Sequence, residues 1–123
     1  MKKNIRACDI WGVRGLLFVF DIENTRDLRR EEITVSKNVN SDDELEELFD
    51  ILLRPEFLSY TENERNLFIA TLVHFLDAGD NFNGVFSKID TYFDEEVKDQ
   101  RKFMSVLLEC LRRYQAEWEV RML

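Results

Sequence analysis

The sequence has few of the residues that usually mark catalysis, metal binding or covalent cross-linking. It contains one histidine, two cysteines, one proline and four glycines in 123 residues. No HxH, HxxxH or CxxC spacing is present, so a zinc site has no recognisable ligand set. Neither GxGxxG nor GxxxxGK occurs, which removes the glycine-rich phosphate loops. These absences argue against an enzyme with a familiar metal or nucleotide site, and we expect no cofactor.

The few reactive residues that are present have ordinary structural explanations. Cys8 and Cys110 lie in apolar stretches and are expected to be buried free thiols of a reducing cytosol, with a disulfide between them as the alternative. His74 lies within the most apolar segment and is expected to be a core histidine. Asp9 and Arg14 interrupt the N-terminal apolar run, so no signal peptide is predicted. No window approaches the roughly 20 apolar residues of a membrane span, and a soluble, cytoplasmic protein is expected.

The length predicts one domain that spans residues 1–123, and its capped and periodic segments predict a mainly α fold. Hydrophobic residues make up 45% of the chain and ten residues are phenylalanine, which is enough for an aromatic core. The helix from about 61 to 78 is the clearest element. Thr61 and Glu64 are spaced as a capping box, and Gly79 provides a C-terminal cap. Because nearly every residue between Leu67 and Leu76 is apolar, we expect this helix to lie at the centre of the domain.

Other segments are predicted around that helix. Ser41 and Glu44 suggest a second capping box, and Pro55 predicts the end of the helix that follows Ser41. Apolar spacing predicts a helix over 82–93 and a last helix that starts near Asp94 and runs towards the C-terminus. The first 40 residues are expected to hold either a short β-hairpin, pairing 16–23 with 32–36, or an additional helix.

Negative charge is the strongest functional signal. The formal net charge is −8, from 25 acidic and 17 basic residues. Such a balance disfavours binding to nucleic acid or to an anionic membrane, because both require a surface rich in lysine and arginine. It favours a basic protein as the partner, although many acidic domains are acidic only for solubility.

The acidic residues concentrate in two segments, 41–50 and 76–100. The first segment has six acids and no base, and the second has seven acids against two lysines. Beyond its first turn, the helix after Ser41 carries acids at i, i+3 and i+4 that repel one another. A basic partner would relieve this repulsion, whereas a solvated helix face is the plain alternative. The predicted partner-binding residues are Asp43, Glu46, Glu47, Asp50, Glu95 and Glu96.

The sequence resembles the immunity proteins of bacterial contact-dependent growth inhibition systems, and more narrowly a helical immunity protein that opposes an EndoU-type RNase toxin. The likeness lies in two stretches, ACDIWGVRGLLFVFDIENTRDLRREE and NLFIATLVHFLDAGDNFNGVFSKIDTYFDEE. It implies a bacterial cytoplasmic protein that binds its cognate toxin domain and covers the RNA cleft. No binding residue is carried over by position, because such proteins diverge quickly. The alternatives are an acidic nucleic-acid mimic and an enzyme with an unrecognised cleft.

Overall fold

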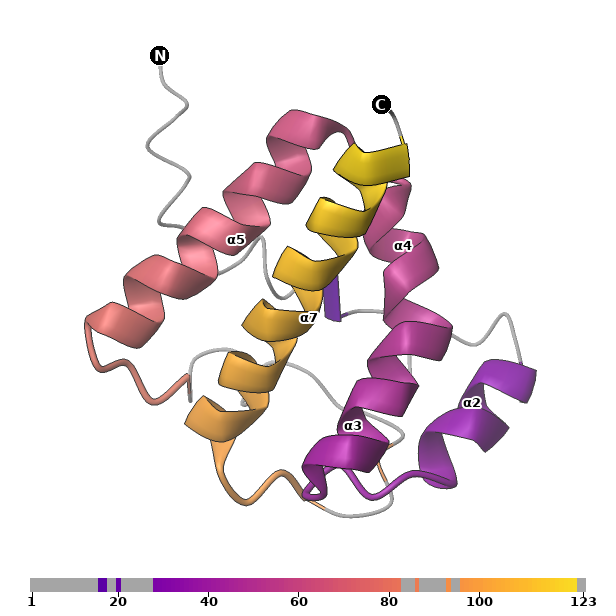
Figure 1. The fold of residues 1–123 in the computed structure, drawn as a ribbon. Coiled ribbons are helices and arrows are strands. Elements are labelled where there is room, and N and C mark those ends of the chain that lie inside the picture. Colours follow the sequence, from indigo (N-terminus) through magenta and orange to yellow (C-terminus); the bar gives the residue numbers. More distant parts are fainter. Residues whose placement is uncertain are drawn as a thin grey trace.

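The computed structural model describes residues 16–17, 20, 28–82, 86, 93 and 96–121. The protein is mainly α, as the sequence predicts, and no residue in these ranges lies in a strand. Figure 1 shows how the helices are arranged. Their order along the chain is α2 (Leu28–Val35), α3 (Asp42–Leu48), the π-helical segment η3 (Phe49–Leu53), α4 (Arg54–Leu58), α5 (Glu62–Asp77) and α7 (Gln100–Arg121).

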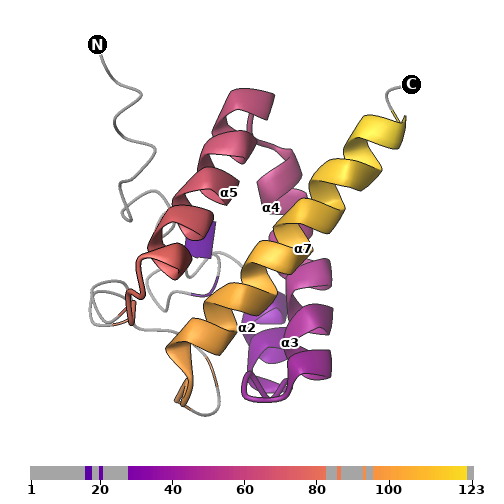
Figure 2. The same ribbon diagram turned by 60° about the vertical axis from the view of Figure 1, so that its left-hand side comes forward.

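The central helix is α7, which lies between α5 on one side and the α3–η3–α4 helix on the other (Figures 1 and 2). It packs against all of these elements. Its buried side chains are Phe103, Met104, Val106, Leu107, Cys110, Leu111, Tyr114 and Gln115. Phe49 meets Phe103 edge-on, with 5.4 Å between ring centroids, and Phe57 lies 6.3 Å from the ring of Tyr114. These ring contacts join α7 to η3 and α4.

Helix α5 has the predicted ends but not the predicted central position. The side chain of Thr61 accepts from the Glu64 N–H while Glu64 accepts from the Thr61 N–H, which completes the capping box. Gly79 ends the helix with φ at +78°, a conformation that glycine adopts at little cost. Only one apolar side chain of α5, Leu72, is fully buried, and Leu67 is 37% exposed. The apolar run therefore covers α7 from one side, and several of its residues face outwards.

The helix after Ser41 differs from the prediction at both ends. Ser41 makes no side-chain cap, and Glu44 instead accepts from the backbone N–H of Asn38 at 2.9 Å. Pro55 does not end the helix, because α4 continues to Leu58. The N–H of Arg54 bonds to the carbonyl of Phe49, five residues back, and Pro55 follows at the start of α4, where its missing N–H is tolerated.

The π-helical segment also explains which residues of this helix are buried. Leu45, Phe49, Leu53 and Phe57 are each at most 1% exposed and are spaced four residues apart. In a regular helix of 3.6 residues per turn, each residue turns the chain by about 100°. Twelve such steps separate Leu45 from Phe57, so the Phe57 side chain would point about 120° away from the direction of Leu45. The wider π turn absorbs part of this rotation, because its bonds span five residues. All four side chains therefore point into the core.

Three further predictions have different outcomes. The proposed strand 32–36 is wrong, because most of it belongs to α2. Most of its partner 16–23 and of the helix predicted over 82–93 lies outside the described residues. The last helix begins at Gln100 rather than near Asp94, and the side chain of Asp99 caps it by accepting from the Lys102 N–H at 3.0 Å. No helix within the described ranges is long and apolar enough to cross a membrane.

Candidate protein-interaction surface

Four of the predicted partner-binding residues lie on α3 and the start of η3. We call Asp43, Glu46, Glu47 and Asp50 the acidic face. Asp43, Glu47 and Asp50 are exposed and Glu46 is half-buried, so all four carboxylates reach the surface. The other two predictions stand apart from this face. Glu96 is exposed before α7, where its carbonyl accepts from the Asn40 side chain at 3.0 Å, and Glu95 lies outside the described residues.

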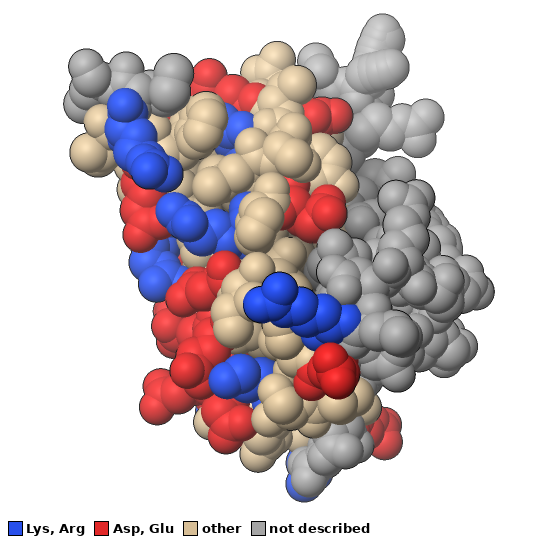
Figure 3. Space-filling model, turned by 90° about the vertical axis from the view of Figure 1, so that its right-hand side faces the viewer, with Lys and Arg blue, Asp and Glu red and all other residues tan. Residues whose placement is uncertain are grey.

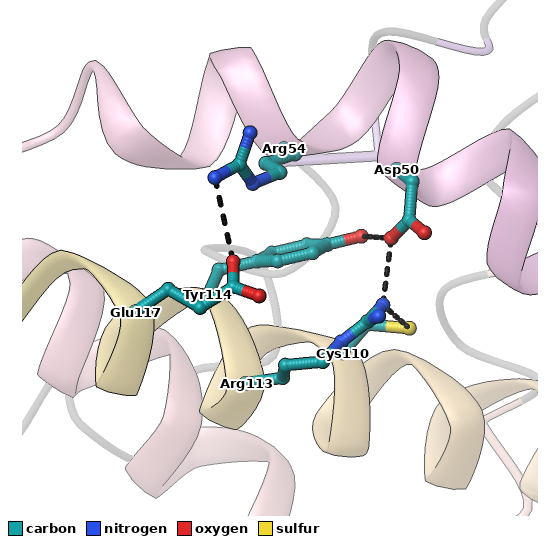
Figure 4. Close-up of polar contacts among 6 residues, drawn as sticks. All are labelled: Asp50, Arg54, Cys110, Arg113, Tyr114 and Glu117. Atoms are coloured by element: carbon teal, nitrogen blue, oxygen red, sulfur yellow. Dashed lines mark hydrogen bonds and ion pairs between the residues drawn. The ribbon is translucent and has the colours of Figure 1, made fainter.

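Asp50 is already bonded within the molecule. Its Oδ1 accepts from Arg113 Nη2 at 2.7 Å and from the hydroxyl of Tyr114 at 2.6 Å (Figure 4). Both partners come from α7, so Asp50 connects η3 to the central helix. The pair with Arg113 is partly open to water, with side chains 42% and 44% exposed. Sequence reasoning missed these partners because they lie more than sixty positions away along the chain.

Glu47 and the neighbouring Asp42 are also paired by bases outside α3. Lys37 reaches Glu47 at 3.4 Å, and Lys102 at the start of α7 reaches Asp42 at the same distance. Among the described residues, no hydrogen bond or ion pair joins the side chain of Asp43 or Glu46 to a base. The absence of bases within 41–50 therefore overstated the repulsion on this helix. On the acidic face, Asp43 and Glu46 are the acids without a cation from the described part of the chain.

Beside the acidic face, the structure forms a groove that the sequence did not predict. Its volume is about 710 Å³. The lining residues are Asp50, Arg54, Arg113, Tyr114, Ala116, Glu117, Val120 and Arg121. They come from η3, α4 and the C-terminal half of α7, where the spacing 113, 116–117 and 120–121 places them on one side of the helix. Figure 3 shows acidic side chains gathered at the lower left of the molecule, with basic side chains above them.

Arginines surround one buried ring in this groove. The guanidinium carbons of Arg54 and Arg113 lie 5.9 and 5.3 Å from the centroid of the Tyr114 ring, within the range of a cation–π contact. Figure 4 shows the two arginines on opposite sides of the ring, with Arg54 also paired to Glu117 at 3.3 Å. Burial, followed by the hydrogen bond to Asp50, raises the pKa of Tyr114 well above its usual range. Tyr114 therefore stays protonated and acts as a donor.

Cys110 and His74 provide no chemistry at this surface. Cys110 is a free thiol that is 2% exposed, and burial raises its pKa, which keeps it in the unreactive thiol form. The prediction for Cys8 lies outside the described residues. His74 is exposed on α5 with its ring edge-on to Phe75, so the prediction of a core histidine is wrong. Within the described ranges, no group of three or more histidine, cysteine or carboxylate side chains could hold a metal ion.

A second polar contact lies on the other side of α7. Arg65 of α5 is 3% exposed, and its Nε donates to Gln115 at 2.8 Å while its Nη1 donates to the carbonyl of Tyr60. The guanidinium also lies 5.1 Å from the ring of Trp118. These contacts fix the α4–α5 turn against α7. Arg65 therefore has a structural explanation and belongs to neither the acidic face nor the groove.

No protein-family model, curated protein or solved structure matches the chain.

Proposed function

We propose that this protein is an inhibitor that binds a cognate nuclease toxin through its acidic face. The observation that carries the proposal is the combination of charge and apolar exposure on one helix. Ile51 follows Glu47 after about one turn and is 47% exposed, which is unusual for a large apolar side chain. Protein interfaces commonly place an apolar anchor among charged residues that remain hydrated at the rim. Ile51 and the surrounding carboxylates have this composition.

The chemistry of a nuclease supports a basic partner. A toxin that cleaves RNA must present lysine or arginine to the phosphates, and an inhibitor that covers this cleft should be acidic at the contact. Opposite charges also speed the encounter between two proteins. Since no base of the described ranges pairs with Asp43 or Glu46, these two acids can accept bonds from such a partner directly. Glu47 and Asp50 would have to share or exchange Lys37 and Arg113.

A nucleic-acid mimic is the second candidate, and the ion pairs argue against it. Mimicry of a phosphate backbone requires a row of open negative charges along an extended surface. Here Lys37 neutralises Glu47, and Arg113 neutralises Asp50. The remaining open acids on this face favour a compact contact with one protein. An enzyme that uses the groove as its cleft is the other alternative, and a turnover assay with RNA and nucleotide substrates would reveal it.

The first test is the genomic neighbourhood. A large gene directly upstream whose C-terminal domain is toxic to cells would support a toxin–inhibitor pair. Expression of that domain alone should stop growth, and co-expression with this protein should restore it. Growth arrest that persists despite full expression of both proteins would contradict the proposal.

The second test measures association of the purified pair by stopped flow at low and high salt. The double variant Asp43→Asn and Glu46→Gln keeps side-chain shape and removes two charges that have no cation within the described residues. We expect several-fold slower association and a weaker salt dependence. The matched control is Glu62→Gln with Asp77→Asn, which removes two exposed acids from α5. Equal association rates for the two double variants would remove the acidic face from the interface.

A further inference from the structure

The α3–η3–α4 helix and α7 run in the same direction (Figures 1 and 2). Ion pairs join the two helices at successive levels. Asp42 pairs with Lys102 near the start of both helices, and Asp50 pairs with Arg113 further along. Arg54 and Glu117 form the last pair, at 3.3 Å. Charges on the two helices can therefore be compared level by level.

Between these helices the surface charge changes sign from one end to the other. On the N-terminal side of the Asp50–Arg113 pair, Asp43 and Glu46 lie on α3, and the exposed Glu109 lies one turn before Arg113 in the middle of α7. No described base contacts any of these three acids. Towards the other end are the guanidinium groups of the groove, which belong to Arg54, Arg113 and Arg121. Asp50 and Glu117 oppose these three arginines and pair with Arg113 and Arg54, so among the described residues Arg121 supplies the excess positive charge of the groove on a chain with net charge −8.

We propose that this surface binds a second copy of the same chain in a two-fold symmetric dimer. Two adjacent patches of opposite charge are self-complementary when one molecule is turned by half a revolution about an axis between them. Each acidic end then meets the groove of the other copy, and every contact occurs twice. The Asp50–Arg113 pair lies between the two ends and therefore close to the axis.

The groove also contains apolar surface that the second copy would cover. Val120 is 68% exposed, and the exposed Ala116 lies one turn before it on α7. Surface ion pairs alone contribute little to association, because hydration and side-chain entropy offset most of the attraction. Burial of the Val120 side chain against the second copy supplies the free energy of association that the ion pairs do not. Charge sets the orientation of the two copies, while apolar contact stabilises the dimer.

Dimerisation would regulate the proposed inhibitor, and this consequence alone rests on the proposed function. The second copy covers Asp43 and Glu46, which are the residues assigned to the toxin. Toxin binding and self-association therefore compete for one surface. The dimer itself is tested on the purified chain without any toxin, so failure of one proposal is distinguishable from failure of the other.

Charge exchange between Glu46 and Arg121 tests the dimer. Sedimentation equilibrium on the parent should show a concentration-dependent dimer. Glu46→Arg and Arg121→Glu should each raise the dissociation constant of the dimer by roughly tenfold or more, because like charges then face each other twice. An equimolar mixture of the two variants should recover association at parental strength, since both contacts of the mixed dimer again join opposite charges.

Two controls carry the same changes elsewhere. Glu62→Arg on α5 and Lys98→Glu before α7 alter exposed residues outside the proposed contact, and each should dimerise like the parent. Circular dichroism on every variant checks that the helices are retained. A parent that stays monomeric at the highest concentration it reaches would overturn the dimer. So would single variants that dimerise like the parent, or a mixture that fails to regain association.

Discussion

The bond between Tyr114 and Asp50 should have a measurable share in stability. The Tyr114 ring is 1% exposed, and its hydroxyl donates to a carboxylate at 2.6 Å. Hydrogen bonds to charged groups contribute about 1.5–3 kcal/mol to stability. Asp50 is 42% exposed, so water can replace the lost donor, and Tyr114→Phe should cost about 1–2 kcal/mol. Removal of the whole ring in Tyr114→Ala should cost about 3–5 kcal/mol through loss of packing.

Urea unfolding followed by circular dichroism measures these costs. The parent, Tyr114→Phe, Asp50→Asn and the double variant form a cycle that isolates the coupling between the two side chains. We expect a coupling of about 1 kcal/mol, because the double variant loses the same bond only once. Phe57→Leu provides a control, since it alters the ring beside Tyr114 without removing a hydrogen bond. If Tyr114→Phe unfolds within about 0.3 kcal/mol of the parent and the coupling is zero, the bond contributes nothing to the native state.

Three more predictions concern burial and ionisation. Leu72→Ala should lower the free energy of unfolding in urea by about 2–5 kcal/mol, because Leu72 is fully buried. Leu67→Ala should lower it clearly less, because Leu67 is 37% exposed. Equal costs would mean that α5 packs differently. Cys110 should react with a thiol reagent at pH 8 much more slowly in the folded protein than in urea, since burial raises its pKa; equal rates would place it at the surface. The raised pKa of Tyr114 means that the folded state holds its proton more tightly, so stability is retained below the unfolded pKa of about 10 and falls as pH rises beyond it. Urea midpoints between pH 9 and 11 should fall less in Tyr114→Phe than in the parent.

The sequence predicted the parts of the fold that depend on local signals. Thr61 and Glu64 lie three residues apart, so the capping box could be recognised without tertiary information. The same pattern failed at Ser41, because Glu44 accepts from the Asn38 N–H in the preceding turn. Pro55 was misleading for a related reason, since the five-residue bonds of η3 place it where an N–H is not needed. Local spacing does not reveal a π-helical turn.

The position of the central helix and the groove could not be predicted in the same way. Apolar density pointed to α5, yet α7 is central because its apolar side chains face helices on both sides. The groove joins residues of α4 and α7 that are about sixty positions apart in the chain, and only the packing of the helices brings them together. Asp50 was correctly selected as an exposed acid, but no local spacing links it to its partner Arg113, which lies 63 positions further along the chain. Contacts between residues so far apart in the sequence cannot be predicted without the tertiary structure.

The π-helical segment η3 gives the chain a site that can lose one residue. Phe57 follows Leu45 by twelve residues, whereas three turns of a regular α-helix take about eleven. The wider turn of η3 accommodates the one extra residue. Deletion of the exposed Ile51 would therefore let the whole segment become a regular α-helix with both ends still facing the core. The cost to folding should be far smaller than for a deletion one turn earlier, at Glu47, which would rotate Leu45 and its neighbours relative to η3. Chain length is thus more freely variable at η3 than helical structure normally allows, and an insertion accepted there in the past would have left this wider turn behind.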